Sequence, residues 1–233
     1  MAATDNRKVV EGVHKMTPSE AFVETCVANG VSEMFGIMGS AFMDAMDIFA
    51  PAGIRLIPVV HEQGAAHMAD GYARATKKAS VVLSHLSPGL TNACTGVANA
   101  ALDSIPMVAI TGQVPTSMIG TDAFQEVDTY GLTIPITKHN FLVGSARELL
   151  EVIPKAFSLA ASGRPGPVLV DIPKDVQNER IEVSEWPEPG RPEAVPEADA
   201  QLIERAAAMI NDAQRPIFYL GGGVVHSGAA AQA

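Results

Sequence analysis

The sequence contains little cysteine: Cys26 and Cys94 are its only two thiols in 233 residues. Neither has a second cysteine within a few positions, so the chain offers neither a disulfide framework nor a zinc site of cysteine ligands. His61, His67 and His85 also lack the spacing of metal ligands, and we expect structural roles for them. Two isolated thiols suit a reducing compartment, which predicts a cytoplasmic location.

Basic residues are also scarce, with 16 Lys and Arg against 26 Asp and Glu and a formal net charge of −10. Non-specific nucleic-acid binding needs clusters of Lys and Arg that displace counterions from phosphates, so we expect no nucleic-acid partner. The sequence has no run of about 18 uninterrupted apolar residues, which predicts no membrane span. Its start, MAATDNRKVVEGVHKM, lacks the continuous apolar core of a signal peptide.

Apolar residues, in contrast, make up 47% of the sequence, enough for a substantial core. Short apolar runs alternate with helical segments of about a dozen residues. The runs are continuous rather than alternating in polarity, as in strands covered on both faces. We therefore predict an α/β fold with a mainly parallel sheet and helices on both faces. The expected strands are 33–35, 54–60, 80–85, 106–111, 139–143 and 166–172.

A capping box marks the start of the first helix, because Thr17 and Glu20 stand three positions apart with Pro18 between them. Gly30 is expected to end this helix. Further helices are expected over 62–75, over 87–103 after a turn, and over 145–161.

The region after 177 changes character. Prolines among acidic residues, at Pro187, Pro189, Pro192 and Pro196, predict a linker over 178–198. We assign 1–177 to the first domain and 199–233 to the beginning of a second α/β domain, with a helix at 199–212 and a strand at 216–220. One helix and one strand cannot close a core. We therefore expect the second domain to be truncated here or to depend on another chain.

Glu62 is the first candidate for chemistry, because it follows the apolar strand at 54–60 and begins the next helix. Parallel α/β sheets gather their functional groups at the carboxyl ends of the strands. A glutamate in a first helical turn is also favoured by the helix dipole alone, so the position has a structural explanation as well. The small residues that follow, Gly64 to Ala66, suggest that something approaches the backbone closely here.

Four segments carry a resemblance to the pyrimidine-binding domain of thiamine-diphosphate enzymes. They are HEQGAAHMADGYAR, SPGLTNACTGVANAALDSIPMVAITGQVP, GTDAFQEVD and SGRPGPVLVDIPKDVQ. Residues 80–177 are most similar to the acetolactate synthase large subunit. Residues 16–71 resemble sulfoacetaldehyde acetyltransferase, a member of the same superfamily.

The resemblance implies that thiamine diphosphate is the cofactor and that Glu62 is catalytic. In this family the glutamate hydrogen-bonds N1′ of the aminopyrimidine and favours the tautomer that takes the proton from the thiazolium carbon. A carboxyl group in an apolar crevice suits that role, because it can share or donate a proton near neutral pH.

Other cofactor contacts are also implied by the resemblance. Ile37, in FGIMGSA, corresponds to the loop beneath the pyrimidine, and Pro88 and Asn92, in SPGLTN, correspond to a turn near the cofactor. Phe124 and Gln125, in DAFQE, match residues beside the reacting carbon. Gln125 is therefore the second catalytic candidate, and Phe124 is assigned to the substrate channel.

The sequence departs from the acetolactate synthase pattern at three places. Met38 and Ser40 stand where a proline and a second glycine are usual, and Ser87 replaces the usual first glycine. These departures weaken the assignment to acetolactate synthase within the superfamily.

Three basic residues complete the implied site. Lys138, in TKHNFLV, matches a lysine of the substrate channel, and Arg164, in SGRPGPV, matches an arginine that contacts FAD in acetolactate synthases. Arg164 can also be explained as a loop arginine between turn residues. We place Lys174 on the same side as Arg164 and assign it to the substrate channel.

Three functions follow from these residues. The first is the N-terminal part of a carboligase like acetolactate synthase, which decarboxylates pyruvate and transfers the two-carbon unit to a 2-keto acid in branched-chain amino acid biosynthesis. The second is a sulfoacetaldehyde acetyltransferase, which converts sulfoacetaldehyde and phosphate to acetyl phosphate and sulfite. The third, of another class, is a non-catalytic α/β binding or interaction domain.

The resemblance also implies that parts of the cofactor site lie outside this chain. Family members hold the diphosphate through Mg²⁺ at a GDG motif followed further on by asparagine, and the sequence contains no such motif. Mg²⁺ is therefore expected to bind through a domain absent from this chain, and the isolated chain is expected to be inactive. The family's site lies between subunits, which implies a homodimer or homotetramer.

Overall fold

The computed structural model describes residues 14–178, 180–184 and 188–232. The signal-peptide expectation falls mostly on 1–13, which lies outside the described residues, as does Pro187 of the predicted linker. The chain divides into two compact units, Met1–Ala194 and Val195–Ala233.

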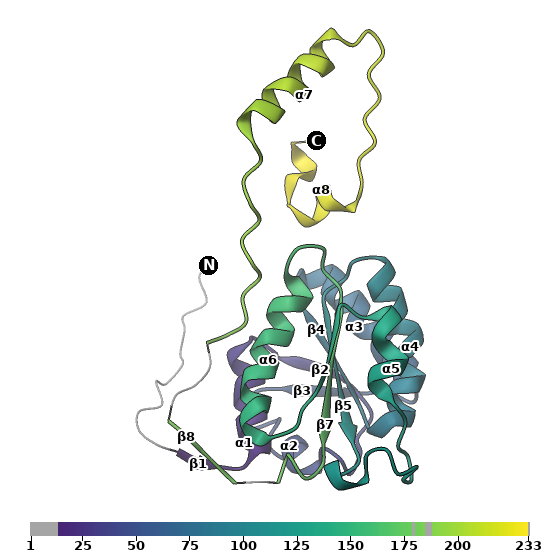
Figure 1. The fold of residues 1–233 in the computed structure, drawn as a ribbon, viewed down its shortest axis with the longest axis vertical. Helices are drawn as coiled ribbons and strands as arrows, with labels where there is room; N and C mark the ends of the chain where they lie inside the picture. Colours follow the sequence, from purple (N-terminus) through teal and green to yellow (C-terminus); the bar gives the residue numbers. More distant parts are fainter. Residues whose placement is uncertain (1–13, 179, 185–187, 233) are drawn as a thin grey trace. The chain divides into compact units, whose positions relative to one another are not determined.

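The first unit is built on a six-stranded sheet in which every neighbouring pair is parallel (Figure 1). Its strand order is β3-β2-β4-β5-β7-β6. The bounds are β2 (Glu33–Gly36), β3 (Arg55–Pro58), β4 (Ser80–Ser84), β5 (Met107–Gln113), β6 (His139–Leu142) and β7 (Pro167–Pro173). The three central strands β4, β5 and β7 are buried along their whole length, as their continuous apolar sequences require.

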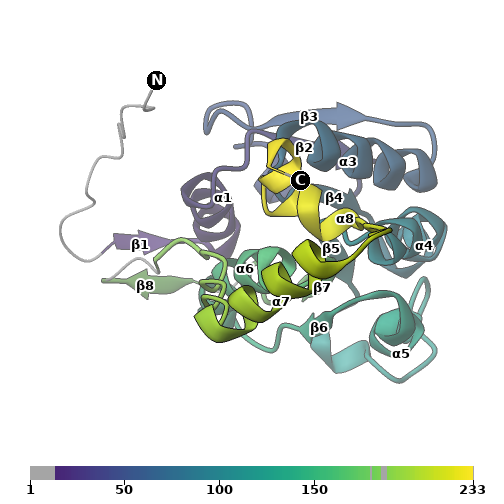
Figure 2. The ribbon, with the colours of Figure 1, turned by 90° about the horizontal axis from the view of Figure 1, so that it is seen from above.

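Helices cover both faces of this sheet, which confirms the predicted fold class (Figures 1 and 2). One face carries α1 (Pro18–Ala28), α2 (Met43–Met46) and α6 (Ala146–Ala161), which share one hydrophobic core with the sheet. The other face carries α3 (Glu62–Thr76) and α4 (Leu86–Leu102), which form a second core. The sheet is thus the middle of three layers.

The capping box of α1 forms as predicted. The backbone N–H of Glu20 donates to Oγ1 of Thr17 at 3.3 Å, and the backbone N–H of Thr17 donates to Oε2 of Glu20 at 2.7 Å. Pro18 occupies the first turn, where its missing N–H leaves no bond unmade.

Small residues let α3 and α4 pack closely. A Cβ added at Gly96 of α4 would lie 2.4 Å from Cβ of Ala66, so the two helices touch at this point through backbone and methyl groups. Ala65 and Ala66 are fully buried in this contact. The close approach to the backbone that was expected here is made at Ala66 by α4 itself. Gly64 differs, since an added Cβ there would meet no atom within 4 Å.

Two short features of the first unit, a two-stranded sheet and a helix, were not predicted. β1 (His14–Met16) pairs antiparallel with β8 (Ile181–Val183), and β8 lies inside the segment predicted to be a linker. Val183 packs with Ala21 and Leu150 of the main body, so this part of the predicted linker is held to the fold. The second missed element is α5 (Thr129–Thr133), which is too short to show a helical period in the sequence.

The second unit contains α7 (Ala200–Asp212) and α8 (Gly222–His226), followed by a short 3-10 helix, η3 (Ala229–Ala231). The predicted helix at 199–212 is confirmed, and the side chain of Asp199 caps it by accepting from the N–H of Gln201 at 2.8 Å. The predicted strand at 216–220 is wrong, because no described residue pairs with this segment. A strand forms only where a neighbour satisfies its backbone N–H and C=O groups.

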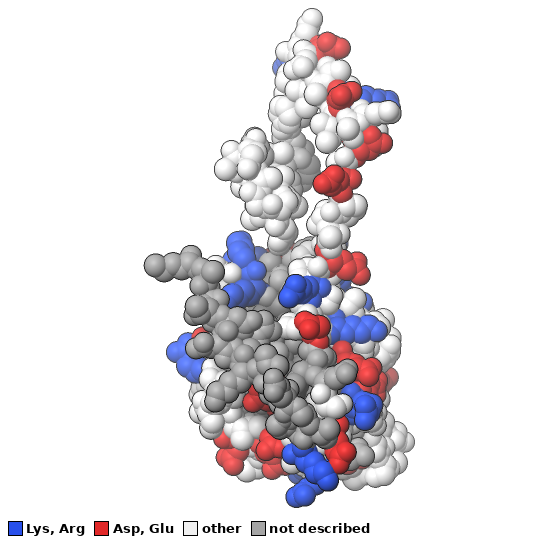
Figure 3. All heavy atoms as spheres, turned by 90° about the vertical axis from the view of Figure 1, so that its left-hand side faces the viewer, with Lys and Arg blue, Asp and Glu red and all other residues white. Residues whose placement is uncertain are grey.

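Charges of both signs are interspersed over the described atoms of the first unit on the side that bears β1 and β8 (Figure 3). Lys15 and Glu182 pair across these two strands at 3.2 Å. Within the part of the chain that the structure describes, no helix is long and apolar enough to cross a membrane.

Candidate functional site

The sheet changes its winding direction between β2 and β4. α2 connects β2 to β3 over one face, whereas α4 leaves β4 over the other face. The loops that follow these neighbouring strands therefore diverge and leave a crevice beyond the carboxyl ends of the strands. We call this end of the sheet the carboxyl edge and the opposite end the amino edge. Glu62 lies at the carboxyl edge, four residues beyond the end of β3, as predicted.

Glu62 is buried, with 8% of its surface exposed, although it is a charged residue at a helix start. Its Oε2 accepts a hydrogen bond from Nδ2 of Asn92 on α4 at 3.0 Å. Its Oε1 lies beside Gly89, where an added Cβ would be 3.1 Å away. No hydrogen bond to Oε1 forms within the described residues, so one carboxylate oxygen is held and the other keeps its capacity for a ligand.

His85 follows β4 and lies next to Glu62 in the crevice. Its ring occupies the space beside Gly39, where an added Cβ would come within 2.4 Å of Nδ1. Nδ1 accepts from the backbone N–H of Ala41 at 3.4 Å. Burial lowers the pKa of His85; the negative charge of Glu62 opposes this shift and the positive charge of Lys174 adds to it. A neutral imidazole therefore fixes the loop after β2, which carries Ile37 and the exposed Met38.

Phe124 and Gln125 lie on the segment 114–128, which connects β5 to α5. The Phe124 side chain is 87% exposed, and Gln125 has a φ of +64°, an uncommon conformation for a residue other than glycine. This segment meets the first turn of α4, because the N–H of Val127 donates to Oγ of Ser87 at 3.0 Å. Ser87 stands two residues before Gly89, the neighbour of Glu62. Because α4 begins at Leu86, Pro88 also lies in its first helical turn. Residues 87–92 are therefore helical and do not form the separate turn that the sequence predicted.

The basic residues separate into two groups at opposite edges. Lys174 follows β7 at the carboxyl edge, where its backbone N–H donates to the carbonyl of Gln113 at 3.1 Å. Arg164 precedes the same strand and Lys138 precedes β6, so both lie at the amino edge. The expectation that Lys174 shares a side with Arg164 is therefore wrong, because the full length of β7 separates them.

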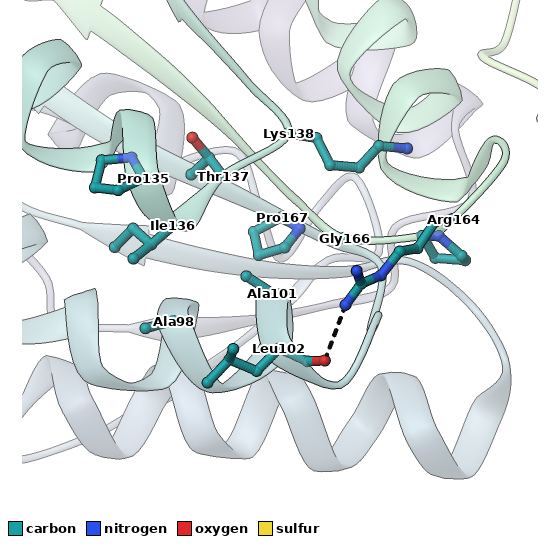
Figure 4. A pocket seen from close by; sticks show the side chains of 11 residues that line it. Ala98, Ala101, Leu102, Pro135, Ile136, Thr137, Lys138, Arg164, Gly166 and Pro167 are labelled. Carbon is teal, nitrogen blue, oxygen red and sulfur yellow. Dashed lines mark hydrogen bonds between the residues drawn. The ribbon is translucent and has the colours of Figure 1, made fainter. Parts of the chain in front are cut away.

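At the amino edge, Arg164 and Lys138 border a hollow of about 400 Å³ (Figure 4). Nη2 of Arg164 donates to the carbonyl of Leu102 at 3.1 Å, and Nε donates to Oγ of Ser104 at 2.7 Å. Nζ of Lys138 donates to the carbonyls of Leu159 and Ser162 at the end of α6. Burial lowers the pKa of Lys138, and the charge of Glu193 partly offsets this. Both cations thus donate hydrogen bonds to carbonyls at helix C-termini, where the helix dipole favours positive charge.

A buried polar network near the site was not predicted from the sequence. Asp171 on β7 is 1% exposed, and its Oδ2 accepts from Nε2 of Gln113 at 3.0 Å and from the hydroxyl of Thr129. Burial raises the pKa of Asp171 to about 6, although both hydrogen bonds favour its charged form. A charged residue inside a continuous apolar strand was the available signal, because such residues are seldom buried without partners.

The described residues include no group of three or more His, Cys, Asp and Glu side chains that could hold a metal ion. The arrangement at the carboxyl edge is that of an α/β domain which presents a buried carboxylate to a ligand at the switch point of its sheet.

Comparison with known proteins assigns this domain. Residues 16–132 match the family described as thiamine pyrophosphate enzyme, N-terminal TPP binding domain. The chain is 52% identical over its 233 residues to a sulfoacetaldehyde acetyltransferase of Alcaligenes xylosoxydans xylosoxydans, of which it covers 38%. It is 49% identical over 216 residues, 92% of its length, to the acetolactate synthase isozyme 1 large subunit of Escherichia coli (strain K12), of which it covers 38%.

A third relative, the acetolactate synthase large subunit of Corynebacterium glutamicum, is 45% identical over 221 residues, 92% of this chain and 35% of the relative. The chain thus spans well under half the length of these relatives. It belongs to the thiamine pyrophosphate enzyme family.

Proposed function

We propose that this chain is the N-terminal, pyrimidine-binding part of a thiamine-diphosphate enzyme that transfers a two-carbon unit. The single observation that carries this proposal is the buried carboxylate of Glu62, with Oε2 held by Asn92, at the switch point of a sheet that belongs to this family. When bound, thiamine diphosphate supplies a carbon nucleophile and an electron-accepting ring.

The residues at the carboxyl edge fit the pyrimidine side of that cofactor. A ring nitrogen that shares a proton needs a carboxyl oxygen beside it, and no described residue bonds Oε1 of Glu62. Gly89 leaves this oxygen uncovered, because a Cβ at that position would lie 3.1 Å from it. Glu62 would hold and move the proton at the ring nitrogen, while Asn92 keeps the carboxylate in one orientation.

The remaining residues of this edge have positioning roles in the proposal. Ile37 and Pro88 would border the pyrimidine, and Gln125 would act beside the reacting carbon. Phe124 and Lys174 would line the channel through which a 2-keto acid or sulfoacetaldehyde enters. Lys138 lies at the amino edge, so a role in the same channel requires that edge to meet another part of the full enzyme.

The acetolactate synthase reaction is our preferred assignment, since residues 80–177 carry that pattern and relatives of this name are 45% to 49% identical. Sulfoacetaldehyde acetyltransferase is the second candidate. It is favoured by the 52% identity along the whole chain and by Met38 and Ser40 in the loop that His85 supports. The two reactions differ in the donor, pyruvate in one and sulfoacetaldehyde in the other, and in the acceptor, a 2-keto acid in one and phosphate in the other.

The proposal places the diphosphate, with Mg²⁺, on a domain outside this chain and the site between two subunits of a homodimer or homotetramer. Exposed apolar side chains near the site support this arrangement: Met38 (67%), Val60 (101%) and Phe124 (87%). FAD is proposed to bind where Arg164 lies if the enzyme is an acetolactate synthase.

The test is proton exchange at the reacting carbon of the bound cofactor in the whole enzyme. Glu62→Gln keeps the shape but removes the group that moves the proton, so exchange should slow roughly 100-fold or more. Product analysis with pyruvate alone, and with sulfoacetaldehyde plus phosphate, separates the two candidates. An exchange rate equal to that of the wild type would show that Glu62 does not have this role.

A further inference from the structure

One buried carboxylate is not used by the proposed reaction. Asp171 lies in the middle layer of the fold on β7, and its Oδ2 accepts two hydrogen bonds, from Gln113 and from Thr129. No described residue bonds its Oδ1, which is also buried. A buried carboxylate with one oxygen that accepts no hydrogen bond destabilises a fold relative to an apolar residue. A role for Asp171 therefore depends on the two residues that it does bond.

The two partners stand at the two ends of the segment 114–128. Gln113 is the last residue of β5, and its Oε1 accepts from the backbone N–H of Val114 at 2.9 Å. Thr129 is the first residue of α5. A single carboxylate therefore joins the residue that precedes the segment to the residue that follows it, although 58 and 42 positions separate Asp171 from these partners.

A second carboxylate from the same stretch of chain holds the beginning of the segment. Asp175 accepts from the backbone N–H of Thr116 at 3.0 Å and from its hydroxyl at 2.6 Å. Burial alone would raise the pKa of Asp175. The hydrogen bonds from Thr116 and from the backbone of Asp175 and Val176 together outweigh burial, so the pKa lies below its usual value. The stretch that follows β7 thus fixes the segment at its base while its tip stays exposed.

The tip carries Gln125, which is proposed to act beside the reacting carbon, and Phe124, which is proposed to line the substrate channel. Phe124 projects into solvent, and Gln125 holds a left-handed backbone that persists only where its surroundings impose it. A tip in this conformation needs a rigid base, because a small displacement of a reacting group lowers the rate strongly.

We infer that Asp171 is a positioning residue that clamps both ends of the segment 114–128 and thereby presents Phe124 and Gln125 to the reacting carbon. This inference rests on the proposed function for its second half, and the clamp itself is a property of the fold. Hydrogen bonds to an ionised group at a buried position are strong enough for this task.

The test uses Thr129→Val in the whole enzyme, which keeps the shape of Thr129 but removes the hydroxyl that donates to Asp171. Thr129→Ser restores the hydroxyl. Thr133→Val is the matched control, since Thr133 is buried in the same helix but donates to the backbone carbonyl of Thr129 and not to Asp171.

Hydrogen exchange is measured first, without cofactor, at the backbone amides of 116–128. Exchange should rise roughly tenfold or more in Thr129→Val and stay close to that of the wild type in Thr129→Ser and Thr133→Val. Equal exchange in Thr129→Val and Thr133→Val would overturn the clamp. If Thr129→Val does not fold, Asp171→Leu, which removes both acceptor oxygens, replaces it, and the same comparison with Thr133→Val decides.

Turnover is measured next. For Thr129→Val the turnover number should fall about tenfold, with cofactor affinity and the exchange rate at the reacting carbon within twofold of the wild type, because Glu62 is untouched. Faster hydrogen exchange at the amides of 116–128 with an unchanged turnover number would overturn the positioning role while leaving the proposed function intact. The rate of proton exchange at the reacting carbon of the cofactor in Glu62→Gln tests the proposed function separately.

Discussion

Nδ2 of Asn92 lies 3.0 Å from Oε2 of Glu62, so α4 orients the one carboxylate that α3 brings to the carboxyl edge. Seven residues further along α4, Asn99 joins the same pair of helices, because its Nδ2 donates to Oδ2 of Asp70 at 3.0 Å. Two asparagines on one helix thus make the same bond to acidic residues on its neighbour, and only one of these bonds is at the proposed site.

This repetition gives a matched test of orientation. Asn92→Ala should slow proton exchange of the bound cofactor about tenfold in the whole enzyme, because Glu62 loses the donor that fixes its Oε2. Asn99→Ala removes an equivalent bond away from the site and should leave the exchange rate unchanged. Equal rates in the two variants would mean that Asn92 does not position Glu62.

A second prediction concerns the contact between α3 and α4. Gly96→Ala places a Cβ 2.4 Å from Cβ of Ala66, so the helices must move apart, and we expect about 1–3 kcal/mol of destabilisation. The intrinsic helix preference of alanine, worth up to about 1 kcal/mol, offsets only part of this.

Gly71→Ala is the control for that substitution, since Gly71 lies in α3 with no atom within 4 Å of an added Cβ. This variant should be stabilised by up to about 1 kcal/mol. Chemical denaturation of both variants checks the sign. Stabilisation of Gly96→Ala to the same extent would show that the helices are not in the close contact described here.

The features that could be predicted from the sequence are those that depend on residues close to one another along the chain. The capping box of Thr17 and Glu20, the strands of the six-stranded sheet and the position of Glu62 follow from short patterns and the strand-end rule. The partners of Asp171 could not be predicted, because they come together only through the packing of β5, β7 and α5. The length of β7 separates Arg164 from Lys174, which a linear motif does not reveal. The strand expected at 216–220 failed because a strand depends on a neighbour that composition does not specify.

The buried Asp171 predicts a pH dependence of stability. Its pKa is raised by burial from 3.8 to about 6, so the folded state binds this proton more tightly than the unfolded state. The contribution to the free energy of unfolding is therefore full below about pH 4 and is lost as the pH rises through about 6. The loss is on the order of 3 kcal/mol.

Asp171→Asn removes this titration. The difference in free energy of unfolding between variant and wild type should therefore change steadily between about pH 4 and 6 and stay constant above about pH 7. Taking the difference cancels the opposite contribution of Asp175, whose pKa lies below its usual value. A difference that is independent of pH would contradict a raised pKa for Asp171.

The last prediction decides whether the amino edge binds a flavin. Arg164 holds α4 through Leu102 and Ser104 beside the hollow of about 400 Å³, and a bound FAD should raise the thermal midpoint of the whole enzyme. Arg164→Ala should abolish that increase. Arg147→Ala removes an exposed arginine from the start of α6, at the other edge, and should keep it. Because Arg164 also stabilises the end of α4, the increase must be compared within each variant, with and without FAD. If saturating FAD neither binds nor raises the midpoint of the wild type, the flavin assignment fails and the acetyltransferase reaction becomes the better candidate.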